Sequence, residues 1–82
     1  MPYYVYILKS ETSGRSYIGQ TSALLKRLDE HNSGKSLATR HGKPWVLIHA
    51  EEFKTRTEAV KRERFYKTIT GRRELKEIGI IN

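Results

Sequence analysis

Two short β-prone segments separated by a turn constrain the fold of this chain more than any other feature. The first, residues 3–9, is rich in Tyr, Val and Ile and includes Tyr6, and the second, residues 15–20, includes Tyr17. Between them, residues 11–14 read Glu-Thr-Ser-Gly, and Ser and Gly favour tight turns. The pattern predicts a β-hairpin that carries one of these tyrosines on each strand.

The register of this hairpin decides whether the two tyrosines meet. Side chains alternate between the faces of a sheet, so Tyr6 and Tyr17 share a face only when an even-numbered residue pairs with Tyr17. Pairing Leu8 with Tyr17 sets Ser10 opposite Arg15 and leaves a loop of ordinary hairpin length. We expect this register, although a β-bulge would allow others.

The rest of the chain alternates helical and extended patterns. Ser22 is a candidate N-cap for a helix over residues 23–32, with leucines 24, 25 and 28 as its apolar face. The further elements are a polar loop over 33–44, an apolar strand over 45–50, a helix opened by the capping-box sequence at 55–58 and continuing to about 68, and, after a break at Gly71, a short helix over 72–78. The order β-β-α-β-α, with a final helix, predicts an α+β fold in which helices flank a small three-stranded antiparallel sheet. We expect residues 1–82 to form a single domain.

The charge of the chain points to a polyanionic partner. Sixteen Lys and Arg residues against nine Asp and Glu give a net charge of +7 and a pI near 9.9, which favours binding to nucleic acid. The alternative is a solvated basic surface that only keeps the protein soluble. The sequence contains no Cys, so a disulfide framework and a cysteine zinc site are excluded. No segment resembles a signal peptide or a membrane span, so we expect a soluble cytoplasmic protein with no membrane contact.

Glu63 is the residue that fits a purely structural helix least well. On the predicted second helix it lies on the same side as Ala59 and Tyr66, so a carboxylate interrupts the apolar face. A carboxylate turned toward a core is costly unless it is paired or binds a cation. Helix geometry alone leaves two interpretations equally open: a buried ion pair with Arg27 or Arg56, and a metal ligand.

Basic residues lie along the predicted first helix and in the loop after it. Arg27 and His31 are four residues apart, so both project from one helix face. An arginine beside buried leucines can grip a phosphate with two parallel hydrogen bonds, or it can lay its stem on the sheet with its head in water. His31 is either a site residue or a surface group. Four further cations are expected to contact nucleic-acid phosphates, with plain solvent exposure as the alternative: Lys35, Arg40, Lys43 and Lys67.

The two tyrosine segments, followed by Arg27, His31 and Glu63, resemble the GIY-YIG nuclease superfamily, whose name describes the two strand motifs. The resemblance covers about the first 68 residues. Some relatives carry a lysine directly after the second motif, where it helps to activate a tyrosine. Gln20 follows the motif in this chain, so His31 or Lys67 is the candidate for that part.

The resemblance implies metal-assisted hydrolysis of phosphodiester bonds in DNA, with a role in repair or recombination. The chain is similar to small single-domain bacterial members of the superfamily, to the nuclease domain of UvrC and to those of Holliday-junction-resolving endonucleases. It assigns catalytic roles to Tyr6, Tyr17, Arg27, His31 and Glu63. Glu63 would hold one Mg²⁺ or Mn²⁺, Arg27 would bind the phosphate oxygens, and one tyrosine would position or deprotonate the attacking water.

Two other kinds of function stay open at the level of sequence. One is a non-catalytic nucleic-acid-binding module that keeps the fold and the basic surface. The other is a protein-interaction subunit that uses Trp45 and the segment 75–81. A partner protein, or a second copy of the chain, is a candidate for selecting the substrate.

Overall fold

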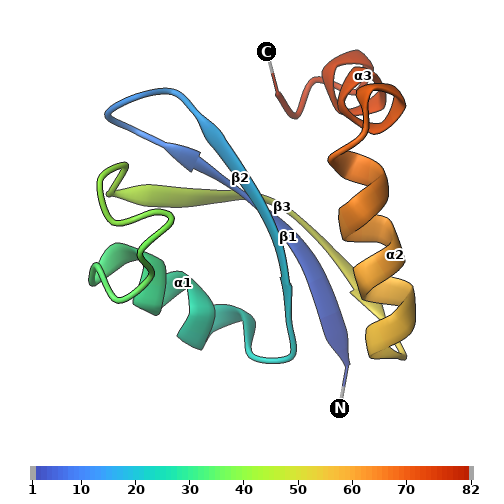
Figure 1. Cartoon of the computed structure of the whole chain (residues 1–82), viewed down its shortest axis with the longest axis horizontal. Helices are drawn as coiled ribbons and strands as arrows, with labels where there is room; N and C mark the ends of the chain where they lie inside the picture. The colour runs from blue at the N-terminus through green and yellow to red at the C-terminus, as the bar shows by residue number, and fades with distance from the viewer. Residues whose placement is uncertain (1, 82) are drawn as a thin grey trace.

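A computed structural model describes residues 2–81 and shows a three-stranded antiparallel sheet with helices on both faces (Figure 1). The strands are β1 (Tyr3–Ser10), β2 (Ser16–Thr21) and β3 (Trp45–Phe53), and β1 lies between the other two. The helices are α1 (Leu24–Asn32), α2 (Arg56–Tyr66) and α3 (Ile69–Glu77). Within residues 2–81 no helix is long and apolar enough to cross a bilayer. The predicted α+β class and the predicted order of elements are confirmed.

The hairpin has the register that the sequence predicted. Leu8 lies opposite Tyr17, and Tyr6 lies opposite Gly19. The turn is closed by the backbone N–H of Ser10, which donates to the carbonyl of Arg15 at 2.8 Å. Because this register places the two tyrosines on one face of the sheet, both project toward α1.

A β-bulge in β3 reverses which residues face which layer. Leu47 pairs with Leu8 of β1, whereas His49 pairs with Ile7, so Ile48 is an extra residue between them. One inserted residue switches the alternation of side chains along a strand. Leu47 therefore packs in the α1 layer, while His49 lies on the side of α2.

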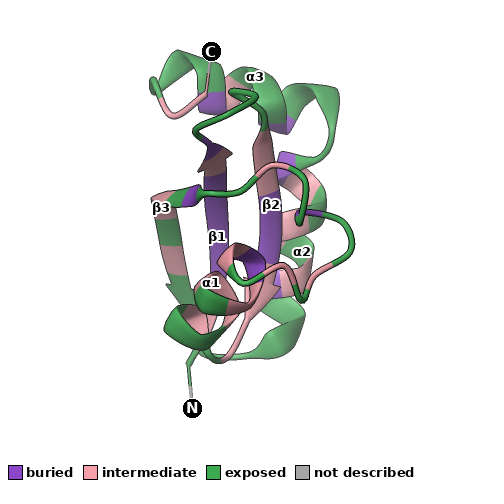
Figure 2. Cartoon of the chain, turned by 90° about the vertical axis from the view of Figure 1, so that its left-hand side faces the viewer, coloured by how far each residue is buried: buried purple, intermediate pink, exposed green. Residues whose placement is uncertain are grey.

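The sheet separates two apolar clusters, and β1 is buried on both faces (Figure 2). The cluster under α2 and α3 consists of Val5, Ile7, Ile18, Ala59, Tyr66 and Leu75. The cluster under α1 consists of Tyr6, Leu8 and Trp45, with Tyr17, Leu24, Leu28 and Leu47 packed against it. A chain this short has little apolar surface to bury, so tyrosines and a tryptophan supply much of both layers.

Some predicted element boundaries are wrong, and the structure shows why. Ala23, not Ser22, holds the N-cap position of α1, and no side chain caps that helix. Leu25 is 79% exposed, so it does not belong to the apolar face. β3 runs on to Phe53, three residues past the predicted end at residue 50, and α2 ends at Tyr66.

The sequence predicted a break at Gly71 before the last helix. In the structure Gly71 instead lies in the first turn of α3. The side chain of Thr68 caps α3 by accepting a hydrogen bond from the Gly71 N–H at 3.1 Å. A Cβ atom at Gly71 would lie 1.9 Å from the carbonyl oxygen of Phe65. Glycine is therefore required for α3 to pack this closely against the end of α2.

Candidate active site

The phenol of Tyr6 is buried under α1 and crosses the backbone of β2 at Gly19. Only 2% of Tyr6 is exposed. A Cβ atom built on Gly19 would lie 2.5 Å from the Tyr6 hydroxyl oxygen and 3.1 Å from Cε1 of Tyr17. Any side chain at residue 19 would therefore displace the phenol, which explains why a glycine stands opposite Tyr6 on β2.

Tyr6 is the first member of a short buried hydrogen-bond chain. Its hydroxyl lies 2.9 Å from Nε2 of His31, and Nδ1 of His31 lies 2.6 Å from Oγ1 of Thr39. His31 is completely buried. Burial, and then the positive charge of Arg27, lower the pKa of His31, so the imidazole is neutral near pH 7. A neutral imidazole has one donor and one acceptor nitrogen, so the chain can relay a proton.

Arg27 lies on the edge of this cluster. Burial raises the pKa of the Tyr6 phenol, and interaction with the guanidinium of Arg27 acts in the opposite direction. Nη1 of Arg27 also contacts Oε1 of Glu30 at 3.4 Å, one turn along α1, and about a third of each side chain is exposed. The guanidinium is thus held beside the phenol while remaining open to solvent.

Tyr17 completes an aromatic group with Tyr6 and His31. Its ring centroid lies 6.3 Å from that of Tyr6, 4.9 Å from that of His31 and 6.4 Å from that of Trp45. Tyr17 is half-buried, whereas Tyr6 and His31 are inaccessible. The structure therefore brings Tyr6, Tyr17, Arg27 and His31 together on the α1 face, with Tyr17 and Arg27 at the surface.

Glu63 comes from α2, which packs on the opposite face of the sheet. Its Oε2 accepts a hydrogen bond from Nζ of Lys67 at 2.9 Å, one helical turn away. This partner is neither Arg27 nor Arg56, the two that the sequence had suggested for a buried pair. Burial is the main cause that raises the pKa of Tyr6, and the negative charge of Glu63 adds the smallest of the contributions.

Glu63 suits a hydrated hard cation better than a protein-enclosed one. Within residues 2–81 no three His, Cys, Asp or Glu side chains cluster in a way that could hold a metal ion. Magnesium needs no such cluster, because it keeps several waters and is held by one or two carboxylates and by substrate phosphates. The side chain of Glu63 is 21% exposed, so it is in partial contact with the solvent from which such an ion would bind.

The loop between α1 and β3 is held against this site. Asn32 bridges the loop, because its Oδ1 accepts from the Trp45 N–H at 2.6 Å and its Nδ2 donates to the Trp45 carbonyl at 3.0 Å. The indole N–H of Trp45 donates to the Thr39 carbonyl at 2.7 Å. Three of the cations predicted to contact nucleic acid are exposed on this loop: Lys35, Arg40 and Lys43. Their contacts with nucleic acid stay a prediction.

Comparison with known proteins identifies the family. The model of the GIY-YIG catalytic domain matches residues 2–76. The chain belongs to the GIY-YIG family.

Several small bacterial proteins are similar over nearly the whole chain. The UPF0213 protein SSP2268 of Staphylococcus saprophyticus is 36% identical over 78 residues, which cover 94% of each chain. A UPF0213 protein of Enterococcus faecalis is 40% identical over 75 residues, covering 88% of this chain and 84% of that one. The solution NMR structure of the UPF0213 protein BH0048 of Bacillus halodurans superimposes with a TM-score of 0.58 at 30% identity, over 96% of this chain and 86% of that one.

Membership of the GIY-YIG family makes this a nuclease-type domain, with nucleic acid as the implied substrate. The predicted family resemblance is therefore confirmed. The individual roles of Tyr6, Tyr17, Arg27, His31 and Glu63 are taken up below as a proposal.

Thr39 of this GIY-YIG protein was missed at the level of sequence. It lies in a polar loop of small residues, and nothing local distinguishes it from its neighbours. Its hydroxyl is buried only because the loop folds back over α1 and meets His31.

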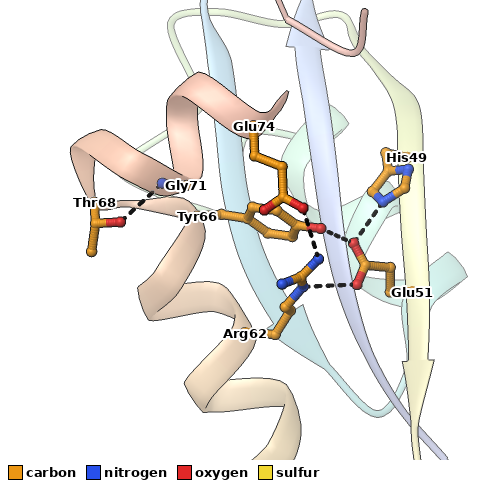
Figure 3. A network of polar contacts seen from close by, with 7 residues as sticks. All are labelled: His49, Glu51, Arg62, Tyr66, Thr68, Gly71 and Glu74. Atoms are coloured by element: carbon orange, nitrogen blue, oxygen red, sulfur yellow. Dashed lines mark hydrogen bonds and ion pairs between the residues drawn. The ribbon is translucent and has the colours of Figure 1, made fainter. Parts of the chain in front are cut away.

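A second polar network, on the α2–α3 face, was also missed (Figure 3). Its centre is Glu51 of β3, which accepts hydrogen bonds from the Tyr66 hydroxyl, from Nε2 of His49 at 2.7 Å and from Nε of Arg62 at 3.0 Å. Arg62 also reaches Oε1 of Glu74 on α3 at 4.0 Å. The network ties β3, α2 and α3 together.

The charges of this network stabilise one another. Burial alone would raise the pKa of Glu51, but the hydrogen bonds from Tyr66, His49 and Arg62 outweigh it and hold the pKa below its ordinary value. Burial and the neighbouring carboxylate raise the pKa of Tyr66 to about 12. Glu51 is therefore ionised and Tyr66 protonated at every pH near neutrality.

Proposed function

We propose that this GIY-YIG protein is a metal-dependent endonuclease that hydrolyses phosphodiester bonds in DNA, in repair or recombination. The observation that carries the proposal is the buried Tyr6 phenol, 2.9 Å from the neutral imidazole of His31 and passing over Gly19. Buried titratable groups in direct contact are found preferentially at functional sites, where burial and a specific partner tune proton transfer.

The hydrogen-bond chain overcomes the weakness of tyrosine as a base. Burial raises the pKa of Tyr6, so the phenol by itself does not deprotonate water at neutral pH. When Nδ1–H of His31 donates to Thr39, Nε2 is free to accept the proton of the Tyr6 hydroxyl. Once substrate binding admits the attacking water to the phenol, which is 2% exposed in this structure, Tyr6 would take a proton from that water while it gives its own to His31. The oxygen of that water bonds to phosphorus and the bond to the leaving oxygen breaks.

Two surface groups beside this hydrogen-bond chain are suited to bind the substrate phosphate. Arg27 presents a guanidinium that can bind two non-bridging oxygens as negative charge builds on them. Tyr17 is half-exposed next to His31, and within residues 2–81 the structure gives its hydroxyl no hydrogen-bond partner. That hydroxyl is therefore open to the substrate and would hydrogen-bond the same phosphate.

Glu63 would hold one Mg²⁺ or Mn²⁺, mostly through water, once Lys67 releases the carboxylate. A cation bound there supplies stabilisation of the negative charge on the leaving oxygen. Lys35, Arg40, Lys43 and Lys67 would contact flanking phosphates, which would give binding with little sequence preference and strong salt dependence. A partner protein or a second copy of the chain would select the DNA structure that is cut.

A nicking assay on the Glu63→Gln variant tests the proposal. Supercoiled plasmid, branched DNA and single-stranded DNA are incubated with Mg²⁺, with Mn²⁺ and with a chelator. We expect cleavage by the parent protein in metal only, and a loss of at least about 100-fold in the variant. Thermal stability should change little, because the Lys67 ammonium that Glu63 contacts is half exposed.

Glu77→Gln is the matched control, because Glu77 is exposed on α3 and forms no ion pair with residues 2–81. It should cleave like the parent protein. Equal cleavage by Glu63→Gln would remove Glu63 from the site. A parent protein that binds DNA but cuts none of the three substrates in either metal would replace the nuclease with a non-catalytic binding module. The protein-interaction alternative loses Trp45 and Leu75, which are core residues, but keeps Ile78 of the same segment, which is 58% exposed.

A further inference from the structure

We propose that a basic pocket between the hairpin turn and α3 is a second binding site for the phosphate backbone of nucleic acid. The pocket has a volume of about 430 Å³ and is lined by four cations, Lys9, Arg15, Arg72 and Lys76. This inference rests on the proposed function, because it extends the substrate path away from the catalytic group. The cations in it are different from those of the α1–β3 loop.

The local fold forces these four cations together. Lys9 follows Val5 and Ile7 at odd-numbered positions of β1, so it projects from the α2–α3 face of the sheet where the apolar core ends. Arg72 and Lys76 are one turn apart on α3, on one side of the helix. Figure 2 shows the hairpin turn at the same end of the sheet as α3. Arg15 ends that turn.

The pocket holds positive charge without compensation. Its lining contains no carboxylate. Within residues 2–81, none of the four cations forms an ion pair, although Arg27, Arg62 and Lys67 all do. Four like charges around one hollow repel one another, and a bound anion relieves that repulsion. Ile48, Ile80 and Ile81 also line the pocket and give it apolar surface, against which the faces of sugars can pack.

Continuity with the candidate active site points to a polymer. Arg15 and Ser16 also line a neighbouring pocket on the α1 face, which contains Tyr17, His41 and Trp45. Arg15 therefore stands between the basic pocket and the exposed tyrosine of the proposed site. A strand whose scissile phosphate lies at Tyr17 would pass Arg15 and place its next phosphates among Lys9, Arg72 and Lys76.

A pair of charge-matched double variants tests this inference. Arg72→Gln with Lys76→Gln removes two cations from the pocket, and Lys61→Gln with Arg73→Gln removes two exposed cations that do not line it. Both double variants lower the net charge by the same amount, so a general electrostatic effect would appear equally in each. Binding of labelled duplex and single-stranded DNA is measured over a range of salt concentrations, and cleavage is measured in Mg²⁺.

We expect the pocket variant to bind DNA at least about tenfold more weakly at low salt, with the slope of log affinity against log salt reduced by about 1–2. Its KM for cleavage should rise while kcat stays within about twofold, since the pocket does not touch the reacting atoms. The control variant should keep the slope and the KM of the parent. Melting temperatures of both variants should match the parent, because all four residues are exposed.

Three results would overturn the inference. Equal weakening by the two double variants would reduce it to general charge, while leaving the nuclease proposal intact. Micromolar binding of a mononucleotide in the pocket, with unchanged DNA affinity in the pocket variant, would make it a small-anion site. A parent protein that binds no DNA even at low salt would remove this inference, and in that case the proposed function fails with it.

Discussion

The two faces of the sheet each carry a buried tyrosine in a polar network, but the networks differ in charge. Under α1, the Tyr6 hydroxyl is hydrogen-bonded to the neutral imidazole of His31, which is hydrogen-bonded to the hydroxyl of Thr39. Under α2 and α3, Tyr66 bonds to Glu51, which is ionised and also bonded to Arg62. The first network can move a proton along its length, whereas the second is held by opposite charges.

This difference indicates which network serves stability and which serves chemistry. A buried carboxylate with three donors stays ionised over a wide pH range and fixes the elements that supply the donors. A chain of neutral donors and acceptors can adopt two proton arrangements, one for each tautomer of its histidine, so a proton can pass along it. The α2–α3 network therefore suits a structural clamp, and the α1 network suits the proposed site.

The largest expected effect comes from removing one hydroxyl on each face. Tyr6→Phe and Tyr66→Phe each delete a buried hydrogen bond, so each should lower the free energy of unfolding by about 1–2 kcal/mol. Only Tyr6→Phe should reduce turnover, by about 10²–10⁴-fold, with DNA affinity nearly unchanged. Urea unfolding and single-turnover cleavage measure the two quantities. Equal losses of turnover in both variants would erase the functional distinction between the faces.

Arg62→Met tests how much the ion pair with Glu51 contributes to the stability of the α2–α3 network. Within residues 2–81 Arg62 is the one partner of Glu51 with a fixed positive charge, so we expect its removal to lower the free energy of unfolding by about 1–3 kcal/mol. Adding Glu51→Gln should recover a large part of that loss, because the stranded charge is then gone. Cleavage per folded molecule should stay unchanged. A double variant as unstable as the sum of the two single variants would show that the residues are not coupled.

Acid should weaken the two networks in separate pH windows. The pKa of His31 is lowered from 6.5, so its contribution to stability is complete above pH 6.5 and is lost as the pH falls through its folded value. The pKa of Glu51 is lowered from 4.5, so its contribution is complete above pH 4.5 and is lost below. Urea unfolding between pH 8 and pH 3 should show both steps.

Turnover should follow the upper step of that profile only, because a protonated His31 cannot accept the Tyr6 proton. His31→Gln should remove this step and Glu51→Gln the lower one. His41→Gln, which changes an exposed histidine, should leave both steps in place. A pH profile of turnover that is flat down to the Glu51 step would exclude His31 from the proton path.

The smallest effect is expected at the exposed pair of Lys67 and Glu63. Lys67→Ala should change the free energy of unfolding by no more than about 0.5 kcal/mol, because the Lys67 side chain is half exposed. The Mg²⁺ concentration for half-maximal cleavage should fall a few-fold, since the ammonium no longer competes for the carboxylate. Lys61→Ala on the same helix is the control. A rise in the required Mg²⁺ would instead show that Lys67 contributes directly to substrate binding.

Local sequence determined most of the α1 face. The alternation of side chains and the turn residues predicted the pairing of Leu8 with Tyr17, and that register alone puts Tyr6 and Tyr17 on one side. The spacing of Arg27 and His31 on one helix face brought both to the same cluster. These relations hold because each depends on residues close together in the chain, where the period of a strand or a helix decides direction.

Only the tertiary structure decided which residues meet on the α2–α3 face and which loop residue joins His31. The bulge at Ile48 turns Glu51 toward α2, where its carboxylate meets the guanidinium of Arg62. Thr39 reaches His31 because a loop folds over α1. A strand pattern does not reveal where an extra residue is inserted, and a loop pattern does not reveal where the loop is anchored, because both are set by packing between segments distant in sequence.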